Sequence, residues 1–245
     1  MTWSILARDP ATGFLGLAVA SKFFAVGAVV PWSDGIAGAV MTQALPNPDW
    51  GPRGLDLLRR GAPPDAVRDM LTAPDPGAPQ RQLHLMDREG NAAAHTGADC
   101  VDWAGHVAGA GVSVAGNMLA GPGVVAATRD AWLDRADLPI VERLIAAMTA
   151  GEAAGGDKRG RQSIALRVQG PESFPRLDLR VDDHPDPIAE LERLYAVGRE
   201  RFIPFSAGMP RRARPWGELD RDVIERTVAR HAGAPLRDLD PETGP

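Results

Sequence analysis

The sequence predicts an α+β fold in which sheets are sandwiched between helices. Strand-like segments come in groups, separated by pairs of helix-like segments, so the strict strand–helix alternation of a doubly wound fold is missing. No predicted strand is followed by a GxGxxG or GxxxxGK[ST] motif. With 245 residues, the chain is long enough for one large domain. We therefore expect a main domain over residues 1–205 and a helical extension over 206–245 that packs on it and ends in a frayed tail.

The first elements form a predicted hairpin. Residues 2–8 alternate in polarity as a strand does, and residues 14–20 return as a second strand. Between them lies a tight turn over residues 9–13, in which Pro10 fixes φ and Gly13 takes the left-handed position. Such a hairpin brings residues 21–22 back beside residue 2.

The rest of the chain is assigned in order. Small apolar residues over 23–31 and 36–41 predict two buried strands, and residues 42–48 form a polar loop locked by prolines. The remaining elements follow from periodicity and from Gly, Pro and Asp boundary signals. They are helices at 53–60 and 64–72, a hairpin of 81–87 with 92–96, strands at 104–108 and 111–115, helices at 123–133 and 138–150, strands at 164–168 and 176–182, and helices from about 187 to 201 and over 218–232.

Composition excludes several classes of function. Hydrophobic residues make up 44% and charged residues 24%, as in ordinary globular proteins. The net charge is -5 and only Lys22 and Lys158 are lysines, so no basic face for nucleic acid is predicted. No apolar run is long enough to span a bilayer, and Arg8 and Asp9 interrupt any signal peptide. We expect a cytoplasmic protein without nucleic-acid or membrane partners.

Cys100 is the only cysteine, which excludes an intramolecular disulfide. Its neighbours Asp99 and Asp102 raise the pKa of the thiol and argue against a catalytic thiolate. We interpret Cys100 as a small buried filler.

Thr2 is the first candidate catalytic residue, because it follows Met1 directly. Removal of Met1 would leave one residue with both a β-hydroxyl and a free α-amino group. The amine has an unperturbed pKa of roughly 7.7–8.0, so its neutral form can accept the hydroxyl proton near pH 7. This is the N-terminal threonine variant of triad chemistry. The alternative is an ordinary Met-Thr start without chemistry.

Two further residues are candidates for catalytic roles. Lys22 is predicted at a strand end beside Thr2, where its ammonium would lower the pKa of the Thr2 amine. A lysine extending its charge from a strand end into solvent is the alternative. Asn117 lies in a glycine-flanked turn over 116–123 that suits an oxyanion hole, although a plain asparagine turn fits equally well.

The candidate substrate-binding residues lie at a strand end and in two loops. Ordinary polar loops are the alternative in each case. These candidates are Ser21, Gln43, Asn47, Asp157 and Ser163.

The sequence gives no firm metal or cofactor signal. Its five histidines are scattered without HExxH spacing, and no GxSxG motif is present. We therefore expect no metal and no cofactor. A weaker hypothesis is a metal-dependent hydrolase built from His95, His106 and Asp102, for which hydrogen-bonded structural histidines are the alternative.

Several segments together resemble one family over residues 1 to about 200. The chain is similar to the bacterial domain of unknown function 1028 family in MTWSILARDPATGFLGLAVASKFFAVGAVVPW, TQALPNPDWGPRGLDLL, HTGADCVDWAGH, GNMLAGPGVV, GGDKRGRQSIAL and DLRVDDHPDPIAEL. This resemblance implies the N-terminal nucleophile (Ntn) hydrolase superfamily and a four-layer αββα sandwich. It also implies that Thr2 is the nucleophile and its amine the base. Relatives in that superfamily carry an acidic residue and a lysine near the nucleophile, where this chain has Ser21 and Lys22.

We therefore expect a hydrolase of a C–N (amide) bond in a small-molecule substrate. Thr2 would attack the carbonyl, Asn117 or backbone amides would hold the oxyanion, and Lys22 would tune the amine. An alternative interpretation is a non-catalytic sandwich that binds a metabolite or a protein partner through the loops at 43–51 and 155–163. In either case a homodimer is expected.

Overall fold

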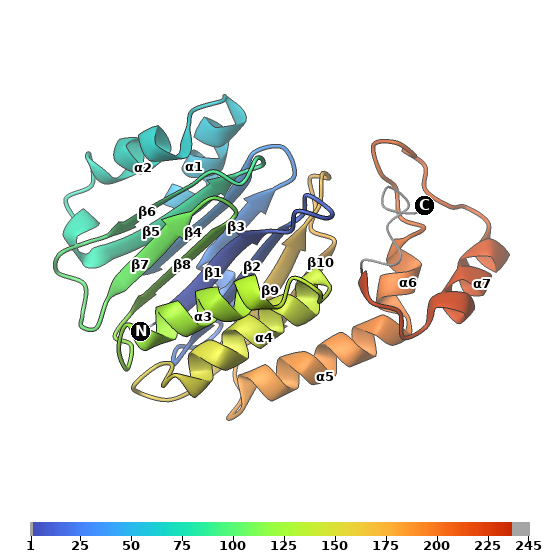
Figure 1. Ribbon diagram of the computed structural model, residues 1–245. Coiled ribbons are helices and arrows are strands. Elements are labelled where there is room, and N and C mark those ends of the chain that lie inside the picture. Colours follow the sequence, from blue (N-terminus) through green and yellow to red (C-terminus); the bar gives the residue numbers. More distant parts are fainter. Residues whose placement is uncertain (1, 237–245) are drawn as a thin grey trace.

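The computed structural model describes residues 2–236, and in this range the chain forms two antiparallel sheets and seven α-helices (Figure 1). The larger sheet has six strands in the order β10-β9-β2-β1-β8-β7. These are β1 (Thr2–Arg8), β2 (Leu15–Ser21), β7 (Gly105–Gly109), β8 (Val112–Asn117), β9 (Ser163–Gln169) and β10 (Leu177–Val181). The smaller sheet has the order β3-β4-β5-β6, with β3 (Pro31–Asp34), β4 (Gly38–Ala44), β5 (Arg81–Asp87) and β6 (Ala92–Thr96).

The sheets face each other, and helices cover their outer faces (Figure 1). Helices α1 (Trp50–Arg59) and α2 (Pro64–Thr72) pack on the smaller sheet. The larger sheet is covered by α3 (Gly123–Asp134), α4 (Ile140–Ala153) and α5 (Pro187–Glu200). Between the sheets, β5 contacts β8 and β1 contacts β4. The layers therefore run helix, sheet, sheet, helix.

The central strand β1 is buried on both faces. Trp3, Ile5 and Ala7 belong to the hydrophobic cluster under α3 and α4, whereas Leu6 belongs to the cluster between the sheets. Successive side chains of a strand point to opposite faces, so each face of β1 finds its own core. Ser4 faces the interior with Leu6, which places a polar group between the two sheets.

Most of the predicted elements are confirmed. The first hairpin forms in the expected register, and Gly13 has a φ of 71° as its turn requires. The hairpin of β5 and β6 and helices α1 to α5 also lie close to their predicted places.

The predicted strand over 23–31 is wrong. This segment is a loop with a short 3-10 helix at Val26–Ala28, and Phe23 is 56% exposed. The Ser163 hydroxyl donates to the Phe23 carbonyl at 2.6 Å and accepts from the Val26 amide at 3.2 Å, so the chain is held out of the sheet. Conversely, Gln43 was expected in a loop but lies in β4, where it is buried.

The C-terminal part extends beyond the end of α5 (Figure 1). It contains α6 (Phe202–Ser206), which was not predicted, and α7 (Arg221–His231), which lies within the predicted helix at 218–232. Ile203 and Leu236 join Tyr195 of α5 in the main hydrophobic cluster. The tail expected beyond residue 236 lies outside the described residues, and the division at 205 stays a prediction. No helix within residues 2–236 is long and apolar enough to cross a bilayer.

Candidate functional site

Thr2 lies at the end of the central strand, where three strands meet. In the sheet it is paired with Ser21 on β2 and with Asn117 on β8. The side chain is 7% exposed, and Thr2 Oγ1 is 3.1 Å from Ser21 Oγ. Thus the predicted nucleophile and two other candidate residues come together.

A small pocket of about 60 Å³ opens beside Thr2. Ser21 and Gln43 are its other polar lining residues, and the rest of its wall is apolar. Within residues 2–236, no Asp, Glu, Lys, Arg or His lines this pocket. We call it the Thr2 pocket.

A chain of buried amides connects the Thr2 pocket with Asn117. Gln82 Oε1 accepts from Gln43 Nε2 at 3.0 Å and from Asn117 Nδ2 at 2.8 Å. Asn117 Nδ2 also lies 3.4 Å from the Thr2 carbonyl oxygen, so both of its amide protons have an acceptor. For the Gln43 amide group, Gln82 is the only acceptor among residues 2–236. Gln43 is therefore better placed than Asn117 to donate a hydrogen bond into the pocket.

The same network continues to a histidine between the sheets. Ser4 Oγ donates to Gln43 Oε1 at 2.6 Å and lies 2.8 Å from His84 Nε2, while His84 Nδ1 lies 3.0 Å from Ser113 Oγ. Since the single Ser4 proton goes to Gln43, His84 Nε2 must donate to Ser4 and His84 Nδ1 must accept from Ser113. Burial, with a smaller contribution from the charge of His106, lowers the pKa of His84 to about 3, so the ring is neutral.

Ser4, Gln82, His84 and Ser113 were not predicted as members of the site. The available signal was positional: Ser4, His84 and Ser113 each lie between two apolar residues of a strand, and Gln82 and His84 are two residues apart on β5. Two-residue spacing puts both on one face of the strand. It did not reveal that this face meets another sheet.

Backbone strain also gathers around Thr2. The non-glycine residues with positive φ in the described chain are Ala25 at 53°, Ala44 at 70° and Met118 at 53°. Ala44 lines the Thr2 pocket, Met118 follows Asn117, and Ala25 lies in the loop that follows β2. Such conformations cost about 1–3 kcal/mol each and are concentrated at functional sites. This end of the sandwich is therefore the candidate site.

Lys22, Asp157 and Ser163 are close to the candidate site but do not line its pocket. Lys22 Nζ donates to the Arg161 carbonyl at 3.0 Å, and the Lys22 backbone amide donates to Asp157 Oδ2 at 2.8 Å. Asp157 is buried and also accepts from the Arg159 amide at 2.8 Å. Together with the Ser163 contacts described above, these bonds fasten the loop that follows β2, which carries one wall of the pocket.

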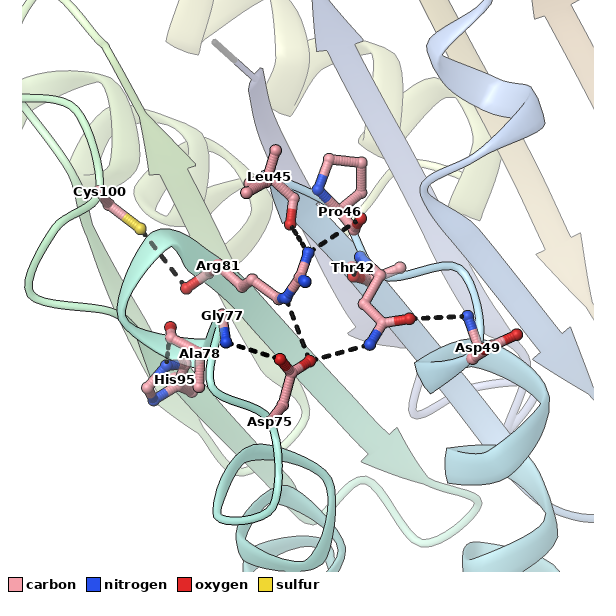
Figure 2. Close-up of polar contacts among 11 residues, drawn as sticks. Thr42, Leu45, Pro46, Asp49, Asp75, Gly77, Ala78, Arg81, His95 and Cys100 are labelled. Atoms are coloured by element: carbon pink, nitrogen blue, oxygen red, sulfur yellow. Dashed lines mark hydrogen bonds and ion pairs between the residues drawn. The ribbon is translucent and has the colours of Figure 1, made fainter.

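Asn47 also supports the loop that forms part of the pocket wall, through Asp75 and Arg81, which are labelled in Figure 2. Asn47 Nδ2 donates to Asp75 at 2.9 Å, Asp75 pairs with Arg81 Nε at 3.1 Å, and Arg81 donates to the carbonyls of Leu45 and Pro46 at 2.6 and 3.2 Å. Burial by itself raises the pKa of Asp75, but the hydrogen bond from Asn47 and the charge of Arg81 contribute to lowering it overall. Asn47 therefore anchors the loop that carries Pro46, a lining residue.

The two histidines of the metal hypothesis bind other groups. His95 Nε2 is 2.9 Å from the Ala78 carbonyl oxygen, and His106 Nδ1 is 2.8 Å from Thr96 Oγ1. Residues 2–236 contain no group of three His, Cys, Asp or Glu side chains that could hold a metal ion.

Cys100 is half-buried and not fully buried as expected, because it lies in the loop between β6 and β7. Its Sγ donates to the Arg81 carbonyl at 3.4 Å (Figure 2). Burial, more than the charge of Asp99, raises the pKa of this thiol.

The protein is thus a mixed α+β sandwich with a small pocket at the end of its central strand, lined by three polar residues and an apolar wall. Residues 2–191 match the model of DUF1028, described as a family of unknown function, and the chain belongs to this family. The crystal structure of protein SPO2555 from Silicibacter pomeroyi, a DUF1028 protein, is 38% identical in sequence, with a TM-score of 0.83 over 90% of this chain and 96% of that one. Anbu (ancestral beta-subunit) from Yersinia bercovieri aligns with 12% identity and a TM-score of 0.37 over 85% of this chain and 98% of that one. None of the curated proteins matches the chain.

Proposed function

We propose that this protein is an N-terminal nucleophile hydrolase that cleaves a C–N amide bond in a small molecule, with Thr2 as the nucleophile. One observation carries the proposal: the Thr2 hydroxyl lies at the end of the central strand and lines a pocket whose other polar groups are Ser21 and Gln43. The helix–sheet–sheet–helix layers support the same class, as does the Ntn superfamily placement that the resemblance to the domain of unknown function 1028 family implies.

The chemistry needs a free Thr2 amine, which cleavage of the Met1–Thr2 bond provides. The neutral amine takes the hydroxyl proton while Thr2 Oγ1 attacks the amide carbon. The C–N bond then breaks, the leaving amine receives the proton, and an acyl ester remains on Thr2. Water attacks this ester, again giving a proton to the α-amine. As the ester bond breaks, the α-amine returns this proton to Thr2 Oγ1 and the carboxylic acid leaves. No atom beyond substrate, Thr2 and water is required.

The neighbours of Thr2 have distinct roles in this scheme. Ser21 Oγ, 3.1 Å from the nucleophile, can relay a proton between the hydroxyl and the amine. Gln43 is the proposed oxyanion donor, because the amide protons of Asn117 are both engaged. Gln82 holds Gln43 and Asn117 in place. Lys22, whose ammonium binds the Arg161 carbonyl, acts on the loop and not on the Thr2 amine.

Intact-mass spectrometry of protein made with its native start tests the proposal. The protein is measured before and after reaction with a β-lactone, an electrophile that acylates activated hydroxyl groups. We expect a mass without Met1 and a single adduct that is lost in Thr2→Ala and kept in Thr2→Ser. Thr12→Ala, at the opposite end of the hairpin, is the matched control and should keep the adduct.

Retention of Met1, or an adduct that persists in Thr2→Ala, would contradict the proposal. Either result would favour the alternative of a sandwich that binds a metabolite or partner without catalysis.

A further inference from the structure

Apart from Thr2, Ser21 and Gln43, the lining of the Thr2 pocket is apolar. This apolar part is formed by Phe23, Val26, Val29, Val30, Ala44 and Pro46. These residues come from the loop that follows β2 and from the end of β4 with its following loop. Their side chains offer no hydrogen-bond donor or acceptor to a ligand group.

The size of the pocket limits what it can hold. Its volume is about 60 Å³. An engineered apolar cavity of about 150 Å³ in a protein interior binds benzene. By this comparison the pocket holds about two to three carbon atoms and is too small to enclose a phenyl ring.

A charged substrate group is excluded from the Thr2 pocket for a different reason. The nearby charged groups are already engaged: Lys22 Nζ binds the Arg161 carbonyl, and Asp157 binds the Lys22 and Arg159 amides. A charged ligand group in the pocket would therefore lose its water without gaining an oppositely charged partner, which is unfavourable.

We propose that the acyl part of the substrate is a short, uncharged aliphatic chain seated in the Thr2 pocket, so that the enzyme cleaves amides of short-chain fatty acids. This inference rests on the proposed function. With the chain against Val29 and Val30, the carbonyl carbon faces Thr2 Oγ1, and its oxygen lies on the side of Gln43. The leaving amine then points to the open side of the pocket.

A series of acyl 4-nitroanilides tests the inference on protein from which Met1 has been removed. The series comprises acetyl, propionyl, butyryl, hexanoyl, phenylacetyl and succinyl derivatives. Each methylene buried in the pocket should raise kcat/KM about fourfold until the pocket is full. We therefore expect a maximum at propionyl or butyryl, with phenylacetyl and succinyl at least about tenfold lower.

Variants of Val29 connect the preference with the pocket. Val29 is half-buried and belongs to none of the hydrophobic clusters, so its substitution leaves the core intact. Val29→Ala should move the optimum to a longer chain, and Val29→Leu should move it to a shorter one. Val197→Ala, at a 49% exposed site on α5, is the matched control and should leave the order of substrates unchanged.

The possible failures are distinguishable. Three results would overturn the inference and leave the hydrolase proposal standing, provided that turnover depends on Thr2. They are equal rates across the series, a preference for succinyl, and an unchanged optimum in the Val29 variants. If no member is turned over and the β-lactone gives no Thr2-dependent adduct, the proposed function itself fails and the inference with it.

Discussion

Acid should destabilise this fold through His84, the neutral ring between the two sheets. Its pKa is lowered from 6.5 to about 3, chiefly by burial. The unfolded chain therefore binds a proton near pH 6.5, whereas the folded chain does not bind it until about pH 3. Between these values the unfolded state holds more protons, so stability falls as the pH falls. Above pH 6.5 the contribution of His84 is fully present.

The size of the effect follows from the same two pKa values. One pKa unit corresponds to about 1.4 kcal/mol. Lowering the pH from 7.5 to 4.5 crosses two units of the window below 6.5, which removes about 3 kcal/mol from the free energy of unfolding. Domains of this kind have about 5–15 kcal/mol in total, so the loss is large.

Urea unfolding, followed by tryptophan fluorescence at pH 7.5, 6.5, 5.5 and 4.5, measures this loss. His84→Asn cannot take up the proton. Between pH 7.5 and 4.5, the wild type should therefore lose about 3 kcal/mol more of its free energy of unfolding than this variant does. The variant should also be less stable at pH 7.5, because its bonds to Ser4 and Ser113 are altered. His231→Asn, at the end of α7 and outside the sheets, is the control and should follow the wild type.

The quantity to compare is the change in the free energy of unfolding with pH. This change reports the protonation of His84, whereas the stability at a single pH also includes the packing that the substitution removes. If His84→Asn and the wild type lose stability in parallel on acidification, then His84 is not the group that responds. The assignment of a neutral ring between Ser4 and Ser113 would then be refuted.

Three further substitutions test the packing around the site, and a fourth, on α5, is a control. Gln82→Leu removes the acceptor shared by two buried amides and should cost about 1–3 kcal/mol for each group left unpaired; urea unfolding with no loss would contradict this. Gly27→Ala places a Cβ 2.4 Å from that of Ala165 and should lower the free energy of unfolding by about 1–3 kcal/mol. Gly198→Ala, in open space on α5, is the control and should raise the free energy of unfolding by up to about 1 kcal/mol. Equal effects of the two alanines in thermal unfolding would refute the clash. Arg81→Met should speed hydrogen exchange in the loop that follows β4, and unchanged exchange would show that Arg81 does not anchor it.

Local patterns in the sequence determined much of the secondary structure. The turn over residues 9–13 fixes the first hairpin because Pro10 and Gly13 restrict the backbone there, so the proximity of Thr2 to Ser21 could be predicted. Proline and acidic residues likewise marked the starts of α2 and α5. These signals act over a few residues, and they need no knowledge of the rest of the chain.

Which strands pair, and which faces meet, was decided only by the tertiary structure. Asn117 lies beside Thr2 because β8 pairs with β1 across more than a hundred residues. Gln82 and His84 became part of the site because their face of β5 meets the larger sheet. The apolar segment after β2 is not a strand, because the side chain of Ser163 binds the backbone of this segment at Phe23, 140 residues away in the sequence. Periodicity shows that a strand has two faces, but it carries no information about the partner of either face.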